Sequence, residues 1–382
     1  MRSPRRFAVA ADRVFDGTTW HEQSAVVVEG AQVQQVVSRA EIPAVPVTRL
    51  PDGIWLAPGF IDLQVNGGGD VLFNDCPTAE TISVIAAAHR KFGTTGFLPT
   101  LITDRPEKTA SAIAAVHDAM RAQPAVLGLH LEGPFISRDK AGVHNPAFIR
   151  VPTSADLDIL TAPRSSALVV TLAPEQLPPQ FIARLAASGA RVCLGHSMAT
   201  YAQTRAAIAE GLSGFTHLFN AMRQLESREP GPIAAALESA SCSYGLIVDG
   251  VHVDPAMLRL ALRGLGNPFL VTDAMPPVGG ARSTFLLYNE EIRIEQNRCV
   301  RGDGTLAGAF LDMASAVRNC VRLLGLPLED ALRLATVNPA AFLGIKAGRL
   351  APGFRADMIA LEPHDIEVLR TWIAGAEPND SD

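Results

Sequence analysis

Eight short apolar segments, most of them followed by a stretch of helical period, constrain the fold of this chain most. They are IWLAPGFIDLQV (54–65), TTGFLPT (94–100), AVLGLHLEG (125–133), ALVVTLAPE (167–175), ARVCLGHS (190–197), GFTHLFN (214–220), YGLIVDG (244–250) and PFLVTDA (268–274). Strands that are apolar throughout are covered on both faces, which is typical of parallel sheets with helical crossovers. Eight such units close a (β/α)8 TIM-like barrel. An open doubly wound sheet is the competing architecture, but no Gly-x-Gly-x-x-Gly motif follows the first strand.

Both ends of the chain have a different pattern, with short β-branched runs separated by turn residues. Examples are SAVVVEGAQVQQVVS (24–38) and RADMIALEP (355–363). We therefore predict a small β-sandwich domain made of residues 1–56 and 348–382, around a barrel of residues 57–347. A hairpin centred on Gln296 and Asn297 is expected within 283–305, followed by a last helix over about 309–325.

Composition excludes several classes of partner. The formal net charge is −6 and no long Lys/Arg run occurs, so we expect no nucleic-acid partner. The basic start MRSPRRF lacks a following apolar core, and no stretch approaches about 18 apolar residues, so neither a secretory signal nor a membrane span is expected. The five cysteines lack C-x-x-C spacing, which favours a cytoplasmic protein without disulfides.

Polar side chains terminate the predicted strands, and the carboxyl ends of barrel strands meet at one mouth. These residues are Gln64 and Asn66, Thr100, Glu132, Glu175, His196, His217 and Asn220, Asp249 and His252, and Asp273. Glu132, His196 and His217 end the third, fifth and sixth strands, and one carboxylate with two imidazoles binds Zn²⁺ or a similar ion while leaving room for water. Asp273, on the eighth strand, would face that water.

A structural role is the alternative for these histidines, since a lone histidine at a strand end is more often simply hydrogen-bonded. A glutamate inside an apolar strand is costly if unpaired, however, and this favours the metal site. His130 shares strand parity with Glu132, and we expect it to support the site rather than bind the ion. The remaining histidines His21, His89, His117 and His364 are interpreted as structural.

The motifs GFIDLQVNG, GLHLEGPF, AGVHNP, GHS, THLFNAM, REPG, DGVHVD and VTDA, in this order, together resemble the N-acetylglucosamine-6-phosphate deacetylases of the amidohydrolase superfamily. The ending GRLAPGFRADMIAL is similar to that superfamily's usual entry into a C-terminal β-domain. The resemblance covers about Ala57 to Ile359. It implies hydrolysis of the N-acetyl group of N-acetylglucosamine 6-phosphate, giving glucosamine 6-phosphate and acetate.

The resemblance also implies a role for each matching position. Glu132, His196 and His217 resemble the metal ligands, Asp273 the catalytic acid/base, and His144 the residue that contacts the sugar and polarises the amide carbonyl. Substrate contacts are implied for Asn220, the backbone at Ala221, Arg228 and His252. In this family a homodimer is expected, in which Arg228 and His252 reach the site of the neighbouring subunit.

Gln64 and Asn66 stand where many amidohydrolases carry His-x-His for a second metal. The resemblance to a Gln-x-Asn subgroup implies one divalent metal ion per subunit, with Gln64 positioning the water through its amide. Zn²⁺ is our first choice, and Fe²⁺, Mn²⁺ and Co²⁺ accept the same ligands.

Three alternatives remain at this point. The motifs do not read the C4 hydroxyl, so N-acetylgalactosamine 6-phosphate is an alternative substrate. A cyclic-amide hydrolase commonly has His-x-His and a bridging carboxylated lysine, and no lysine ends a predicted strand here. A non-enzymatic binding protein with this fold typically loses ligands, whereas Glu132, His196, His217 and Asp273 are all present.

Overall fold

The computed structural model describes residues 5–377. Its central feature is a sheet of eight parallel strands that follow one another in chain order. They are β6 (Phe60–Val65), β9 (Thr94–Ile102), β10 (Gly128–Glu132), β11 (Ala167–Leu172), β12 (Arg191–Leu194), β13 (Gly214–Phe215), β14 (Ser243–Leu246) and β15 (Asn267–Leu270). A parallel bridge from Val65 to Ala274 brings the first strand against the segment after the last one. The predicted barrel is confirmed.

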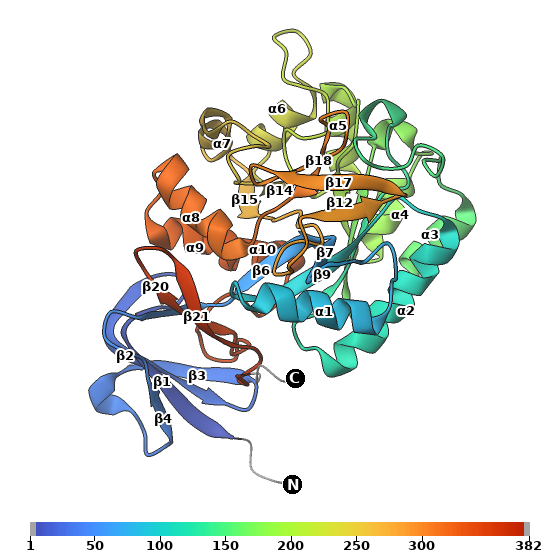
Figure 1. Ribbon diagram of the computed structural model, residues 1–382. Helices are drawn as coiled ribbons and strands as arrows, with labels where there is room; N and C mark the ends of the chain where they lie inside the picture. The colour runs from blue at the N-terminus through green and yellow to red at the C-terminus, as the bar shows by residue number, and fades with distance from the viewer. Residues whose placement is uncertain (1–4, 378–382) are drawn as a thin grey trace.

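Helices surround this barrel (Figure 1). They are α1 (Ala79–Arg90), α2 (Pro106–Ala122), α3 (Ser154–Thr161), α4 (Phe181–Ala187), α5 (Tyr201–Ala209), α6 (Gly231–Glu238), α7 (Pro255–Ala261), α8 (Met313–Leu324), α9 (Leu328–Ala335) and α10 (Val337–Leu343), with short 3-10 turns η2 (Arg138–Lys140) and η3 (Pro174–Gln176). A further 3-10 turn, η1 (Arg39–Glu41), lies in the N-terminal segment. The helix expected over about 309–325 is α8, but it is not the last, because α9 and α10 follow it. It begins after Asp312 because that carboxylate accepts the Ser315 backbone N–H at 2.8 Å, and it ends at left-handed Gly325.

A second sheet joins the two ends of the chain. It contains β1 (Arg6–Phe15), β2 (Trp20–Glu29), β3 (Gln32–Ser38), β4 (Val47–Arg49), β5 (Trp55–Pro58), β20 (Met358–Glu362) and β21 (Glu367–Trp372). It has an apolar core of its own, which includes Val9, Val26, Met358 and Trp372. The exact division into two domains stays a prediction, and residues 1–4 and 378–382 lie outside the described part of the chain.

The apolar run 54–65, which looked like one strand, is two. Its first part is β5 in the end sheet, and its second part is β6 in the barrel. The chain changes sheets at Gly59, where an added Cβ would lie only 2.2 Å from the Thr95 side chain. A glycine there permits the close approach that lets one short segment serve both sheets.

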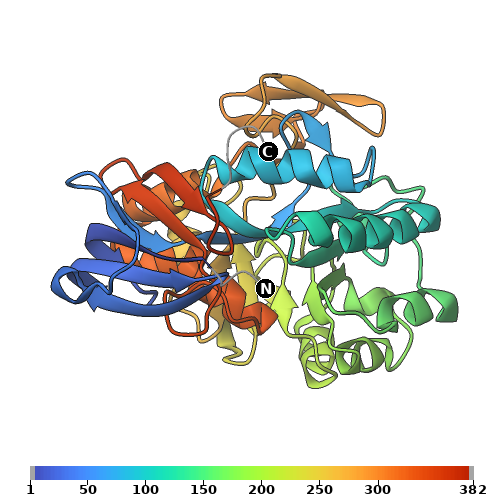
Figure 2. The same cartoon turned by 90° about the horizontal axis from the view of Figure 1, so that it is seen from below.

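A four-stranded antiparallel sheet covers one side of the barrel, with β16 (Thr284–Leu287), β17 (Glu290–Glu295), β18 (Arg298–Val300) and β19 (Leu306–Ala309). The predicted hairpin is confirmed between β17 and β18, where Gln296 and Asn297 both have positive φ. The sheet is larger than that hairpin and forms a separate layer beside α1 (Figure 2). Its last strand reaches the barrel mouth, because the Met275 N–H donates to the Ala309 carbonyl at 3.1 Å.

Gly67 and Gly68 form the short strand β7, and Gly69 and Asp70, both with positive φ, form the tight turn to β8 (Val71–Leu72). No helix within residues 5–377 is long and apolar enough to cross a membrane. All five cysteines are free thiols.

Candidate active site

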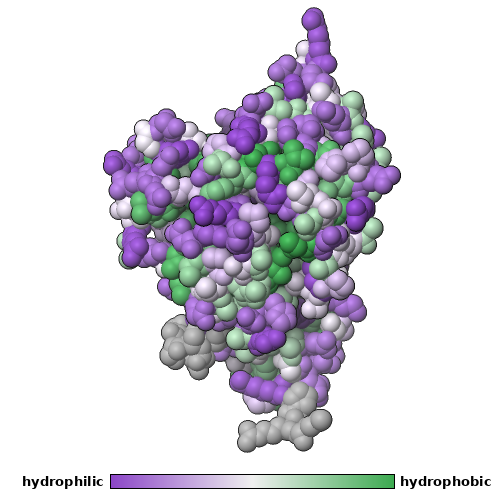
Figure 3. Space-filling model, turned by 90° about the vertical axis from the view of Figure 1, so that its right-hand side faces the viewer, coloured by the Kyte–Doolittle hydropathy of each residue, from purple (hydrophilic) through white to green (hydrophobic). Residues whose placement is uncertain are grey.

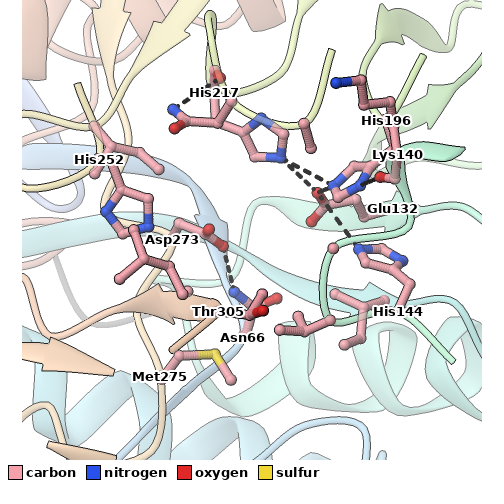
Figure 4. A pocket seen from close by; sticks show the side chains of 18 of the residues that line it. Asn66, Glu132, Lys140, His144, His196, His217, His252, Asp273, Met275 and Thr305 are labelled. Carbon is pink, nitrogen blue, oxygen red and sulfur yellow. Dashed lines mark hydrogen bonds and ion pairs between the residues drawn. The ribbon is translucent and has the colours of Figure 1, made fainter. Parts of the chain in front are cut away.

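A cavity of about 370 Å³ opens at the carboxyl ends of the barrel strands (Figure 4). Eight of the ten site residues expected from the sequence line it: Glu132, His144, His196, His217, Asn220, Ala221, His252 and Asp273. Gln64 lies beside the cavity and hydrogen-bonds to two of them. Arg228 does not line it.

Glu132, His196 and His217 meet at one point in this cavity. The Glu132 Oε1 atom lies 2.9 Å from His196 Nε2 and 3.0 Å from His217 Nε2, and the two nitrogens are 3.1 Å apart. All three side chains are buried. Burial would raise the pKa of Glu132, but the hydrogen bonds with the two histidines hold it well below its usual range.

The hydrogen-bond partners of His196 show which of its ring atoms faces the cluster. Its Nδ1 atom lies 2.7 Å from the Lys140 carbonyl oxygen. Because a carbonyl only accepts, Nδ1 donates to it, and Nε2 is the ring atom that faces Glu132 at 2.9 Å. The donor set of one carboxylate and two imidazoles, with its ligand atoms converging on one point, fits a divalent metal ion.

Local backbone conformation directs three of these side chains into the mouth. His196, His217 and Asp273 each follow a barrel strand, and they have φ angles of 49°, 32° and 52°. Non-glycine residues with positive φ are uncommon, and such conformations cluster at functional sites. Glu175 supports the turn after His196, since its carboxylate accepts the Met198 N–H at 2.6 Å and the Ser197 hydroxyl at 2.7 Å.

Asp273 is held by two amides from the first strand. Asn66 Nδ2 donates to Asp273 Oδ1 at 2.6 Å, and Gln64 Nε2 donates to the same atom at 3.1 Å and to Glu132 Oε2 at 3.0 Å. Both contacts use Oδ1, which leaves Oδ2 for proton exchange. Burial and the nearby Glu132 carboxylate raise the pKa of Asp273 to about 6. Sequence reasoning placed Asn66 at the strand end but missed this contact.

His144 approaches the cluster from the loop after β10, with its Nε2 atom 3.9 Å from Glu132 Oε1. The backbone N–H of Thr103 donates to His144 Nδ1 at 3.4 Å, and the Thr103 hydroxyl lies 2.7 Å from the same atom. A lone pair at Nδ1 satisfies both contacts, and Nε2 then carries the proton that faces the cavity. Burial, then the neighbouring His196, lowers the pKa of His144 well below its usual range, so the ring is neutral. Nothing in the sequence singled out Thr103.

His252 lines the cavity of its own chain, and its expected contribution to a neighbouring subunit's site stays a prediction. Its position follows from Asp249, whose carboxylate accepts the backbone N–H groups of Val251 and His252 at 2.8 and 2.9 Å and contacts His252 Nδ1 at 2.6 Å. The sequence motif contained both residues, but it did not indicate toward which chain the ring points. His252 Nε2 remains for a ligand.

Arg228 is exposed on the loop between β13 and α6, away from the cavity. This loop projects from the body in Figure 1 and forms the hydrophilic extension at the top of Figure 3. His130 also stays out of the cluster. Its ring contacts the Leu63 carbonyl at 3.0 Å and the Thr171 hydroxyl at 2.7 Å inside the barrel, and burial lowers its pKa to about 4.

This chain is similar over most of its length to one protein family and to several known proteins. Residues 55–380 match the model of the amidohydrolase family. An N-acetylgalactosamine-6-phosphate deacetylase of Shewanella sp. is 44% identical over 334 residues, covering 86% of this chain and 84% of that protein. An N-acetylglucosamine-6-phosphate deacetylase of Haemophilus influenzae is 34% identical, covering 92% and 93%. The crystal structure of N-acetylglucosamine-6-phosphate deacetylase from Pasteurella multocida superposes with a TM-score of 0.92 at 33% identity, covering 97% of this chain and 98% of that one.

Proposed function

This chain belongs to the amidohydrolase family, and we propose that it hydrolyses the N-acetyl group of a phosphorylated amino sugar, with N-acetylglucosamine 6-phosphate as the first substrate to test. One observation carries the proposal. Glu132, His196 and His217 converge on a point where their donor atoms fit a divalent cation, and Asp273 stands beside it with one carboxylate oxygen free. This arrangement suits the attack of water on an unactivated amide.

Glu132, His196 and His217 would hold one divalent ion, with Zn²⁺ as the first choice and Fe²⁺, Mn²⁺ or Co²⁺ as alternatives. Such an ion, when bound, acidifies water and polarises a carbonyl oxygen. Gln64 supports a mononuclear site, because its amide nitrogen already donates to Glu132 Oε2 and Asp273 Oδ1. We assign it the positioning of the attacking water through its remaining amide oxygen.

Asp273 takes the proton of the attacking water at Oδ2 and then delivers it to the amide nitrogen, which leaves as the amine of the sugar. Its raised pKa of about 6 places both protonation states within reach near neutral pH. His144 donates its Nε2–H to the carbonyl oxygen as negative charge develops there. One such donor typically contributes about 3 kcal/mol to the transition state.

Asn220, the backbone at Ala221 and His252 line the part of the cavity assigned to the sugar and its phosphate. Arg228 would serve a neighbouring subunit of a homodimer, which its exposed and projecting loop permits. Five free thiols fit a cytoplasmic location, where reducing conditions prevail.

N-acetylgalactosamine 6-phosphate is a second candidate substrate. The Shewanella protein, at 44% identity, is named for that deacetylation, and it is more similar to this chain than the Haemophilus protein at 34%. The two sugars differ only in the orientation of the C4 hydroxyl, so the same catalytic groups serve both.

Acetate release by the metal-loaded protein tests the proposal. N-acetylglucosamine 6-phosphate, N-acetylgalactosamine 6-phosphate and the two unphosphorylated sugars are compared by kcat/KM. We expect rapid release from at least one phosphorylated sugar, and the ratio between the two assigns the epimer. Absence of release from all four, with metal bound, would reject the proposed function and favour a binding protein with this fold.

A further inference from the structure

Lys140 is the only lysine or arginine that lines the cavity within residues 5–377. The other charged groups at the cavity are the carboxylates Glu132, Asp273 and, at the rim, Asp139. From its own chain, a dianionic substrate entering this cavity therefore meets negative charge and one permanent positive charge. Figure 4 shows the Lys140 side chain extending along the mouth, above the ring of His196.

Two hydrogen bonds fix the position of the Lys140 backbone, from which the side chain with its ammonium group extends. The Lys140 carbonyl oxygen binds His196 Nδ1 at 2.7 Å, and the Ser137 N–H donates to the His196 carbonyl at 2.8 Å. The loop that carries Lys140 is thus bound to the metal-binding segment by two hydrogen bonds and has little freedom to leave the mouth.

On its other side, the segment that contains His196 and Ser197 contacts the residues expected to bind the phosphate. The Ser197 N–H donates to the Ala221 carbonyl at 3.1 Å, next to Asn220. The His196 carbonyl and the Ser197 N–H belong to one trans peptide and point to opposite sides, so the turn Ser137–Lys140 and Ala221 flank residues 196–197. Adjacent hydrogen-bonded segments lie about 4.8 Å apart, so about 10 Å separates the backbones of Ser137 and Ala221. A long lysine side chain and a sugar phosphate together can span that gap.

The ammonium group of Lys140 is available for a ligand. Among the hydrogen bonds and ion pairs of the described residues, none uses Lys140 Nζ. By contrast, Lys108 Nζ pairs with Asp104 at 3.3 Å. The side chain of Lys140 is partly buried, so its charge is less screened than that of a surface lysine.

We propose that Lys140 binds the phosphate of the substrate within its own chain and sets the preference for phosphorylated sugars. This inference depends on the proposed function. Arg228 cannot fill this role in the same chain because it lies on an exposed loop outside the cavity. His252 offers only Nε2, since Nδ1 is engaged by Asp249. An ammonium group suits the task as a mobile point charge with three donors.

Two variants test this role. Lys140→Met removes the charge and keeps the apolar stem, whereas Lys140→Arg keeps the charge. The matched control is Lys91→Met, which removes one positive charge from an exposed position at the end of α1. For each protein, kcat/KM is measured with the phosphorylated sugar and with its unphosphorylated form. Bound metal is measured in parallel.

We expect Lys140→Met to lose about 10- to 100-fold in kcat/KM for the phosphorylated sugar, as typical for one charge-assisted hydrogen bond, and to be unchanged with the unphosphorylated one. Lys140→Arg should retain most activity, and Lys91→Met should match the wild type. Equal losses with both sugars, or loss of metal, would mean that Lys140 acts only through His196 and would overturn the proposal. Wild-type selectivity for the phosphorylated over the unphosphorylated sugar in Lys140→Met would also overturn the proposal.

Binding of glucosamine 6-phosphate and of glucosamine by calorimetry separates this inference from the proposed function, because it needs no turnover. If the wild type releases no acetate yet binds glucosamine 6-phosphate more tightly than Lys140→Met does, the proposed reaction fails and the phosphate contact stands. If the two proteins bind it equally, the contact is refuted whatever the reaction.

Discussion

Asp62 provides the sharpest test of how the barrel closes. It is fully buried in β6, and its Oδ1 atom accepts the backbone N–H groups of Gln64 and Thr272, each at 3.2 Å. The Thr272 hydroxyl donates to Oδ2. Asp62 thereby joins the first strand to the segment after the last strand, at the residue that precedes Asp273. Burial raises its pKa to about 7 from 3.8, against the three hydrogen bonds that lower it.

A raised pKa in the folded state makes stability depend on pH with a definite sign. Between the unfolded pKa of 3.8 and the folded value of about 7, the folded protein binds more protons than the unfolded one. The free energy of unfolding therefore falls as pH rises through this window. For a single group with these two values, the linkage relation gives a loss of about 2.5 kcal/mol between pH 5 and pH 8.

Asp62→Asn removes this contribution. The new amide oxygen can accept the two backbone N–H groups, and the amide nitrogen can donate to the Thr272 hydroxyl, which then rotates toward the Gln64 carbonyl at 3.4 Å. We expect the wild type to lose about 2.5 kcal/mol more than the variant between pH 5 and pH 8. The assay is denaturant unfolding of both proteins, metal-free, at the two pH values. An equal pH dependence in wild type and variant would refute the reasoning, because Asp62 would then be ionised throughout.

Three further predictions concern the chemistry. Asp273→Asn should keep its metal but lose about 10²- to 10⁴-fold in kcat; metal analysis and acetate release check this, and normal turnover would remove Asp273 from the reaction. Thr103→Val should lower kcat about tenfold with little change in KM, because His144 loses the hydroxyl that helps hold Nδ1. Thr103→Ser keeps a hydroxyl and should retain the wild-type kcat. Equal kcat in the two variants would count against this role. Titration with Zn²⁺ should give one tightly bound ion per chain, as the Gln64 amide occupies the place of a second ligand set, and two ions would contradict the mononuclear site.

The candidate site could be located from the sequence because its signals are local. Glu132, His196 and His217 each interrupt or end an apolar strand, and a polar side chain in such a place is costly without a partner. The sequence contains no comparable signal for contacts between residues that are distant along the chain. Thr103 and His144 are 41 residues apart, and Asn66 and Asp273 are 207 apart, so only the packed loops show that they touch.

The sequence by itself determined the eight-stranded barrel, the hairpin at Gln296 and Asn297, and the residue types at the mouth, because periodicity and turn chemistry depend on neighbours along the chain. Only the tertiary structure decided that His252 points into its own cavity, that Arg228 lies outside it, and that the Lys140 carbonyl fixes the proton on His196. These outcomes depend on how the barrel closes and how its loops fold over the strand ends. Closure brings together groups that are distant in the chain, and no local pattern encodes those distances.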